Sequence, residues 1–383
     1  MTHNPSKPDS PRPLRFVVAC GGTGGHVFPG VAAAKALKAQ GNEVALILSG
    51  RAVEGERPDG WDGSVILVPC RPPRWRNPLH AASSLFSLAR AFSLALVRIR
   101  RFRPQALLAM GSYTSVPPVL AARALHVPVV LHEANAIPGV AVSRLCHLAS
   151  AVCIAFDEAA AHLPASTTTI NTGMPVRDGI ARAAPGRFAN PSRFTILVMG
   201  GSQGAQKLNK IVADSVALLD RDPAEADALR FIHLAGAKNE EAVRASYSQV
   251  RSIPVEVIGF SNEMGSLYAA SQFCISRAGS SSCFELALCG LPALLVPLPG
   301  LARDHQAANA KAMHTGGACD FELQTELTPE KLAAHIRSIR ADSAKRASMR
   351  AALLARARPD AAEALGRVAR RVATAKNSGQ KPS

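Results

Sequence analysis

The sequence is poor in several features that mark common classes of protein. Aromatic residues make up 5% of the chain, too few for the stacking rings that single-strand nucleic-acid binders interleave with basic residues. None of the eight cysteines forms a CxxC pair, and most lie in apolar runs, so we expect reduced, unmetallated thiols. No run reaches the roughly 18 uninterrupted apolar residues of a membrane span, and residues 1–13 lack a signal-peptide core. These absences predict a cytoplasmic protein whose membrane contact, if any, is peripheral.

Acidic residues are also scarce, and the resulting charge constrains the partner. The chain has 28 acidic and 44 basic residues, a net charge of +16. Such an excess predicts an anionic partner: nucleic acid, a phosphorylated substrate or an acidic membrane surface. With 48% hydrophobic and 19% charged residues the composition is that of a folded protein, and 383 residues are enough for two domains.

The same pattern of strand, glycine loop and helix opens two halves of the chain. An apolar run at 14–20 leads into glycines at 21–25 and a helix at 29–40; a second at 193–199 leads into glycines at 200–204 and a helix at 207–219. Further apolar runs alternate with helical stretches at 44–48, 106–110, 127–131, 151–155, 230–235, 255–259, 273–276 and 293–297. We therefore predict an α/β fold with two Rossmann-like, doubly wound parallel-sheet domains that face each other across a cleft.

The composition of the connecting segments suggests the domain limits. Residues 172–190 are rich in Gly, Pro and Arg and form the natural linker. We predict an amino-terminal domain over 14–175, a carboxyl-terminal domain over 190–345, and a helical segment over 346–376 that packs back toward the amino-terminal domain.

Both glycine loops suit an anionic ligand, because backbone N–H groups and a helix start lie beyond the carboxyl end of a strand. The alternative is that the glycines only allow a tight turn. Neither loop is a dinucleotide fingerprint, since Val27 stands where the third glycine is needed, and no GK[ST] follows either one. Asp220-Arg221-Asp222 resembles a metal-binding DxD, but a helix end before Pro223 is the better interpretation, and we expect no metal.

Two groups in the first half could act on a proton. His26 follows the first glycine loop at a helix start, where the dipole favours the neutral imidazole that a general base requires. It could equally be a histidine that hydrogen-bonds the turn. Glu133 and Asn135 follow the strand at 127–131, so their side chains are expected at the carboxyl edge of the sheet. Their alternative is a turn before Pro138 and Gly139.

The second half supplies polar groups at two helix starts. Ser280 and the next two serines open a helix after a strand, with Glu285 one turn further on. Serines at this position are commonly N-caps, whereas an acid there suits the diol of a ribose. Gln306 lies at the start of a later helix on the same side of the sheet.

Taken together and in order, the motifs resemble those of the MurG family of bacterial glycosyltransferases. They are GGTGGHVFPG at 21–30, GSYTS at 111–115, HEANAIPG at 132–139, TGMPVR at 172–177, GGSQGAQKLN at 200–209, ISRAGSSSCFE at 275–285 and ARDHQAANA at 302–310. The resemblance spans about 14–317. Ala134, Met174, Ser112 and Val116 depart from the family's usual Gln, Asn, Gly and Gly.

The resemblance implies a GT-B fold and an inverting hexosyltransferase that uses no metal or other cofactor. It implies transfer of N-acetylglucosamine from UDP-N-acetylglucosamine to the 4-hydroxyl of the muramoyl residue of lipid I. The product is lipid II, which serves peptidoglycan synthesis and so cell shape and division, at the cytoplasmic face of the inner membrane. The implied donor contacts are Thr23, Gly24, Gly25, Asn135, Arg177, Ser202, Ser261 and Gln306, with Glu285 on the ribose. His26 would be the base, with Glu133 as the second candidate.

A lipid-linked acceptor implies contact with an anionic membrane, and one segment fits it. Residues 71–103 combine many arginines with Trp75, Leu79 and Phe86. A stripe of Leu85, Leu88, Phe92, Leu96 and Ile99 at helical spacing is expected to pack on the sheet, which leaves the other apolar residues for the membrane. The alternative is an ordinary helix with a solvated basic edge.

Two other functions compete with transfer to lipid I. One is an epimerase or hydrolase of UDP-N-acetylglucosamine with the same architecture, which would need more carboxylates than the chain offers at these positions. The other is a basic nucleic-acid-binding protein, which the low aromatic content disfavours. We therefore expect no nucleic-acid partner.

Overall fold

The structure is a computed structural model, and it describes residues 13–22, 24–50, 58, 60–72, 77–177, 179–180, 192–200, 205–300 and 304–377. The chain divides into two compact units. Unit 1 comprises Met1–His132, Arg144–Val152 and Glu363–Ser383, and unit 2 comprises Glu133–Ser143 and Cys153–Ala362. Each of these units combines separate segments of the chain, whereas the domains proposed from the sequence are continuous segments. The proposed domain limits stay a prediction.

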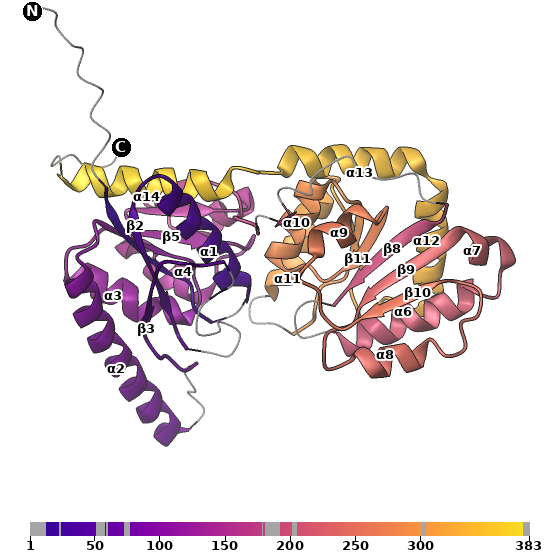
Figure 1. Cartoon of the computed structure of the whole chain (residues 1–383), viewed down its shortest axis with the longest axis horizontal. Helices are drawn as coiled ribbons and strands as arrows, with labels where there is room; N and C mark the ends of the chain where they lie inside the picture. The colour runs from indigo at the N-terminus through magenta and orange to yellow at the C-terminus, as the bar shows by residue number, and fades with distance from the viewer. Residues whose placement is uncertain are drawn as a thin grey trace, which may run out of the picture. The chain divides into compact units, whose positions relative to one another are not determined.

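The first sheet has seven strands in the order β3-β2-β1-β4-β5-β6-β7. Strand β1 pairs in parallel with β2 on one side and β4 on the other. Figure 1 labels β2, β3 and β5 of this sheet. The strands are β1 (Arg15–Ala19), β2 (Glu43–Leu48), β3 (Ser64–Leu67), β4 (Ala106–Ala109), β5 (Val129–Glu133), β6 (Ala151–Ile154) and β7 (Thr169–Asn171).

The second sheet has six strands in the order β10-β9-β8-β11-β12-β13, and all its pairings are parallel. The strands are β8 (Phe194–Met199), β9 (Leu229–Leu234), β10 (Val255–Ile258), β11 (Phe273–Ser276), β12 (Ala293–Leu295) and β13 (Asp320–Phe321). Both sheets thus reverse their strand order beside the strand that precedes a glycine loop, which is the position where doubly wound sheets bind ligands.

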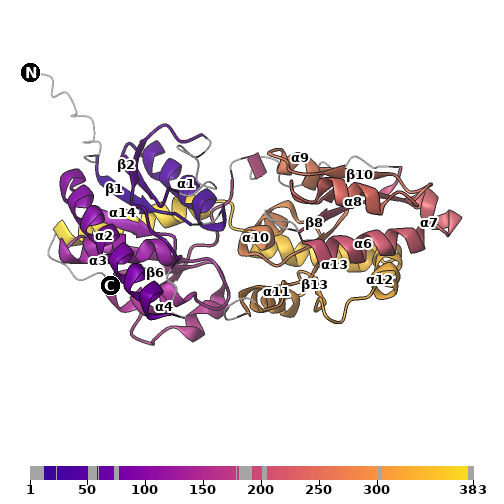
Figure 2. The same cartoon turned by 90° about the horizontal axis from the view of Figure 1, so that it is seen from below.

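The predicted fold class is confirmed, with two Rossmann-like parallel sheets and helices on their faces (Figure 2). The longer helices are α1 (Gly24–Ala39), α2 (Pro78–Phe102), α3 (Val116–Ala124), α6 (Gln206–Leu219), α10 (Ser280–Cys289), α11 (His305–Thr315), α12 (Pro329–Ala341), α13 (Ser343–Arg356) and α14 (Ala361–Asn377). The short ones are α4 (Val140–Leu145), α7 (Pro223–Ala228), α8 (Glu240–Ser246) and α9 (Met264–Ala269). The carboxyl-terminal helical stretch is interrupted before Pro359, and α14 packs on unit 1, where Arg370 donates to Asn42 Oδ1 at 2.7 Å.

The central strands are buried on both faces, which explains their continuous apolar sequences. Phe16, Val17 and Val18 of β1 and Leu197 and Val198 of β8 are fully buried. All eight cysteines are buried as free thiols, and four of them (Cys274, Cys283, Cys289 and Cys319) belong to one apolar cluster in unit 2. The expectation that they act as small hydrophobes is confirmed.

One helix of unit 1 differs from its predicted packing. In α2 the buried residues are Ala91, Ala95 and Ile99, whereas Leu85 is 57% exposed. The predicted stripe is therefore wrong at Leu85, whereas Leu88, Phe92 and Leu96 are half-buried and Ile99 is buried. The helix lies next to α3 (Figure 1). By length and composition, Ala82–Phe102 could cross a membrane, and 17% of that window is buried inside the protein.

Candidate functional site

The candidate residues of unit 1 lie where the neighbouring strands β1 and β4 end. Thr114, after β4, donates its hydroxyl hydrogen to the carbonyl of Gly21 at 2.7 Å. Gly22 has φ +113°, and a Cβ there would lie 2.8 Å from Ser112 Oγ. Ser112 itself has φ 68° and ψ 158°, a conformation that favours glycine. The departure from the family's glycine at Ser112 is therefore a strained position beside the first glycine loop.

The first turn of α1 contains three of the predicted residues. Gly24 and His26 are half-buried and Gly25 is exposed. The turn has no acidic residue, so its backbone N–H groups and the positive end of the helix dipole can receive an anion. Thr23 lies outside the described residues. This arrangement suits a phosphate or diphosphate next to an imidazole.

In unit 2 the loop that follows β5 is held by its own glutamate. One carboxylate oxygen of Glu133 accepts from the backbone N–H of Asn135 at 2.9 Å and from its side-chain amide at 3.0 Å. The other oxygen accepts from the N–H of Gly139 at 2.8 Å. Burial raises the pKa of Glu133, and these N–H groups oppose the rise. The carboxylate is thus engaged in shaping the loop.

The buried side chain of Asn309 joins this loop to two other segments of unit 2. Its Oδ1 accepts from the N–H of Ala136 at 2.8 Å. Its Nδ2 donates to Asn135 Oδ1 and to the carbonyl of Ala278, both at 3.1 Å. Ala278 stands just before α10, and Asn309 lies on α11. The loop after β5 and the starts of α10 and α11 are therefore brought together.

Glu285 is a buried carboxylate on α10 with two polar partners. Its Oε2 accepts from the hydroxyl of Tyr268 at 2.7 Å, and its Oε1 lies 3.5 Å from Arg177 Nη2. Burial raises the pKa of Glu285, and the charge of Arg177 and the hydrogen bond from Tyr268 counteract it. Burial and the neighbouring Glu285 raise the pKa of Tyr268. Because the side chain of Glu285 keeps 10% of its surface exposed, a ligand hydroxyl can still reach it.

The remaining predicted residues have separate local roles. Ser280 begins α10 and is half-buried, but the N-cap is Gly279 without a side-chain hydrogen bond, so the serines are not N-caps. Ser261 Oγ accepts from the N–H of Glu263 at 3.0 Å. Gln306 Oε1 accepts from the N–H of Leu298 at 2.9 Å and so holds the loop that precedes α11. Ser202 lies outside the described residues.

The aspartates of the DxD-like sequence are both used by the backbone. Asp222 caps α7 by accepting from the N–H of Ala224 at 3.1 Å. Asp220 accepts from the N–H groups of residues 251, 252 and 253 at 2.7–2.9 Å. The interpretation of this sequence as a helix end is confirmed.

Sequence reasoning missed the roles of two residues of the unit 2 site, Asn309 and Tyr268. His305 Nδ1 is 3.0 Å from the carbonyl of Ile137, to which it must donate, and so also holds the loop after β5. Asn309 gives no distinct signal, because α11 also contains His, Gln, Lys and Thr residues. Nothing in the sequence around Tyr268 marks it as a partner of Glu285.

Comparisons with known proteins identify the family of this chain. The glycosyltransferase family 28 N-terminal domain matches residues 16–154, and the family 28 C-terminal domain matches residues 195–365. The chain is 35% identical to a UDP-N-acetylglucosamine–N-acetylmuramyl-(pentapeptide) pyrophosphoryl-undecaprenol N-acetylglucosamine transferase of Methylobacterium sp. (strain 4-46), over 91% of this chain and 94% of that one. The transferase of the same name from Allorhizobium ampelinum is 36% identical, over 94% and 96%.

Solved structures show the same relationship. The crystal structure of Acinetobacter baumannii MurG superposes with a TM-score of 0.75 at 28% identity, over 93% of this chain and 99% of that chain. The UDP-GlcNAc 2-epimerase of Neisseria meningitidis shares the fold, with a TM-score of 0.64 at 12% identity, over 91% and 98%. Because two family models together cover both halves of the chain, and full-length relatives exceed 30% identity, the chain belongs to the MurG family of glycosyltransferases.

Proposed function

We propose that this enzyme transfers N-acetylglucosamine from UDP-N-acetylglucosamine to the 4-hydroxyl of the muramoyl residue of lipid I, giving lipid II. The observation that carries the proposal is that relatives which match more than nine-tenths of the chain carry the name of this transferase. The epimerases share the fold at much lower identity. Transfer to lipid I is therefore favoured over epimerisation of the donor.

The donor is assigned to unit 2 on the chemistry of its site. Glu285 is a buried acceptor at the carboxyl edge of the sheet, which suits a ribose hydroxyl, and Arg177 beside it is a cation for the diphosphate. The further polar groups of unit 2 that we assign to the donor are those of Asn135, Ser261, Ser280 and Gln306, with Ser202 of the second glycine loop. The acceptor is assigned to unit 1.

The leaving group sets the main requirement of the reaction. The oxygen of the acceptor's 4-hydroxyl attacks the anomeric carbon, the bond from that carbon to the diphosphate oxygen breaks, and UDP leaves with the bonding electrons. The attack from the opposite side inverts the anomeric centre. The growing negative charge needs fixed positive partners, which Arg177, helix starts and backbone N–H groups supply without a metal ion.

The proton of the attacking hydroxyl is assigned to His26. The carboxylate of Glu133 already accepts three hydrogen bonds within its own loop. To accept a proton from the substrate it would have to give up these bonds, and the loop would lose its support. His26 is half-buried in the first turn of α1, beside a turn suited to an anion. His26 is therefore the base, and Glu133 is a positioning residue.

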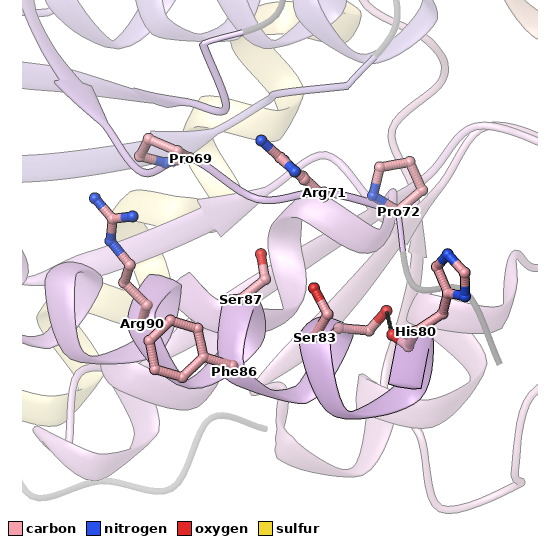
Figure 3. Close-up of a pocket in the computed structure, with 9 residues that line it drawn as sticks. Pro69, Arg71, Pro72, His80, Ser83, Phe86, Ser87 and Arg90 are labelled. Atoms are coloured by element: carbon pink, nitrogen blue, oxygen red, sulfur yellow. Dashed lines mark hydrogen bonds between the residues drawn. The ribbon is translucent and has the colours of Figure 1, made fainter. Parts of the chain in front are cut away.

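We also propose that the enzyme is peripheral, at the cytoplasmic face of the inner membrane, and docks on anionic lipid through α2. On this helix Leu85, Phe86 and Val97 are 57%, 73% and 62% exposed. A groove of about 770 Å³ runs between α2 and residues 69–72, with Arg71 and Arg90 among its lining residues. Figure 3 shows Ser83 and Ser87 directed toward that segment and Phe86 directed away from it.

This combination of apolar and basic side chains fits the boundary between headgroups and acyl chains. The buried alanine face of α2 keeps the helix on its unit, which favours docking over spanning. Trp75 and the side chain of Leu79, which the sequence assigned to the same surface, lie outside the described residues.

The reaction itself can be tested by following UDP. Purified full-length enzyme with UDP-N-acetylglucosamine should release UDP only when lipid I is added, in equal amount to the disaccharide lipid formed. An epimerase or a hydrolase would consume the donor without an acceptor. UDP release at the same rate with and without lipid I would overturn the proposed function.

If His26 is the base, its replacement should lower the turnover rate without changing the affinity for UDP. His26→Ala should lower kcat by roughly 10²- to 10⁴-fold and leave the Kd of UDP unchanged, because a general base acts only in the transition state. His162→Ala, at an exposed histidine, is the matched control and should turn over normally. A loss of donor affinity with normal turnover at saturation would make His26 a binding residue instead.

The role of Glu285 predicts a specific loss of ribose recognition. Wild-type enzyme should bind UDP more tightly than 2′-deoxy-UDP by about 1–3 kcal/mol, the value of a hydrogen bond to a charged group. Glu285→Ala should bind both equally, whereas Tyr268→Phe, which keeps the carboxylate, should still discriminate. Isothermal titration measures all three. Full discrimination by Glu285→Ala would show that the carboxylate only supports Tyr268 and Arg177.

Membrane docking predicts flotation with vesicles that contain phosphatidylglycerol but not with pure phosphatidylcholine, and weaker flotation at high salt. The double variant Leu85→Ser/Phe86→Ser should lose most of this binding, because it removes exposed apolar surface from α2. Leu323→Ser, at an exposed leucine of unit 2, should bind as wild type does. Equal flotation of the double variant and wild type would place the docking surface elsewhere.

A further inference from the structure

A buried chain of polar side chains connects β9, α6 and α8 in unit 2, and none of its members is among the proposed donor contacts. His233 on β9 is fully buried, with Nδ1 2.7 Å from the hydroxyl of Tyr247. Its Nε2 lies 3.2 Å from Oδ1 of Asn209, and Nδ2 of Asn209 donates to the carbonyl of Ala235 at 3.1 Å. Asn209 and Tyr247 are also buried.

The direction of each hydrogen bond in this series of side chains follows from the final acceptor, the carbonyl of Ala235. A carbonyl oxygen can only accept, so the amide nitrogen of Asn209 must face Ala235 and its oxygen must face His233. Nε2 of His233 therefore carries the hydrogen, and its Nδ1 accepts from Tyr247. Burial lowers the pKa of His233 to about 4, so the imidazole is neutral at physiological pH. Only one tautomer satisfies the whole chain.

The chain fixes the beginning of α6 to the carboxyl end of a strand. Asn209 lies in the first turn of α6. Its backbone N–H donates to the carbonyl of Ala205, the N-cap residue of this helix, at 2.8 Å. Ala235 directly follows β9, which pairs with β8 up to Met199 and Leu234. The anchored turn therefore stands at the sheet edge where β8 leads toward the second glycine loop.

Apolar side chains of similar size could fill the same space, and buried polar groups cost desolvation that packing alone would avoid. What the polar chain adds is a defined position, because hydrogen bonds fix distance and angle where apolar contacts allow sliding. The start of a helix is where position matters for an anion, since its N–H groups must point at the ligand.

We propose that His233 is a positioning residue for the donor's diphosphate, acting through Asn209 on the first turn of α6. The inference rests on the proposed function, because it takes a nucleoside diphosphate sugar as the ligand at this edge. It adds to that function a residue which touches no substrate. Tyr247, the residue that follows α8, supports the same imidazole.

The test compares UDP with uridine, which lacks the phosphates, by competition titration on the full-length enzyme. His233→Leu should weaken UDP binding about tenfold, the size expected for the loss of one buried hydrogen-bond link, and change uridine binding less than twofold. His233→Gln can still place an N–H near Asn209 and should restore UDP binding to within about threefold of wild type. Tyr247→Phe should weaken UDP binding in the same direction.

A matched control separates positioning from stability. Val212→Ala shortens a fully buried side chain of the same helix by two methyl groups and creates a cavity, but leaves the polar chain intact, so UDP affinity should stay within about twofold. Circular dichroism shows whether each variant is folded at the titration temperature.

Two results would overturn the inference: equal loss of UDP and uridine affinity in His233→Leu, or normal UDP affinity in both His233→Leu and Tyr247→Phe. If instead wild-type enzyme releases UDP without lipid I, the proposed function fails, and the titrations still report on His233.

Discussion

The carboxamide of Asn309 is the interaction on which the donor site depends most. This buried side chain lies on α11 and uses its oxygen and its nitrogen on two other segments that are far away in sequence, the loop after β5 and the turn that leads into α10. Each of these segments carries a proposed donor contact, namely Asn135, Glu285 and Gln306. Any apolar replacement would leave the N–H of Ala136 and the carbonyl of Ala278 without this partner, at a cost of about 1–3 kcal/mol for each buried group.

The two buried carboxylates of the site are likewise held by polar partners. Glu285 is kept in the interior by one cation and one hydroxyl, and Glu133 by N–H groups of its own loop. A carboxylate that already has partners is pre-oriented, so a ligand hydroxyl that approaches it meets a fixed acceptor. The same reasoning distinguishes the two acids, because Glu285 faces groups from other segments whereas Glu133 serves its loop.

The sequence predicted the central strands well, and the reason is physical. Strands such as β1 and β8 are buried on both faces, so nearly all of their residues are apolar and the run is visible without an alignment. The strands it missed, β3, β7 and β13, are short edge strands whose residues are half-buried or exposed. At the site, the motifs located Glu133, Asn135 and Glu285, but partners such as Tyr268 and Asn309 depend on contacts between distant segments, which no local pattern encodes. On α2 the helical period was correct, and Ile99 is buried as predicted, but Ala91 and Ala95 are also fully buried and Leu85 is exposed.

The most direct test of this account is a crystal structure of the enzyme with UDP-N-acetylglucosamine. The account predicts that the ribose lies against Glu285 and the diphosphate against Arg177 and the first turn of α6, with the sugar near Asn135 and Gln306. A nucleotide whose ribose lies away from Glu285, with that carboxylate still paired only to Tyr268 and Arg177, would contradict it.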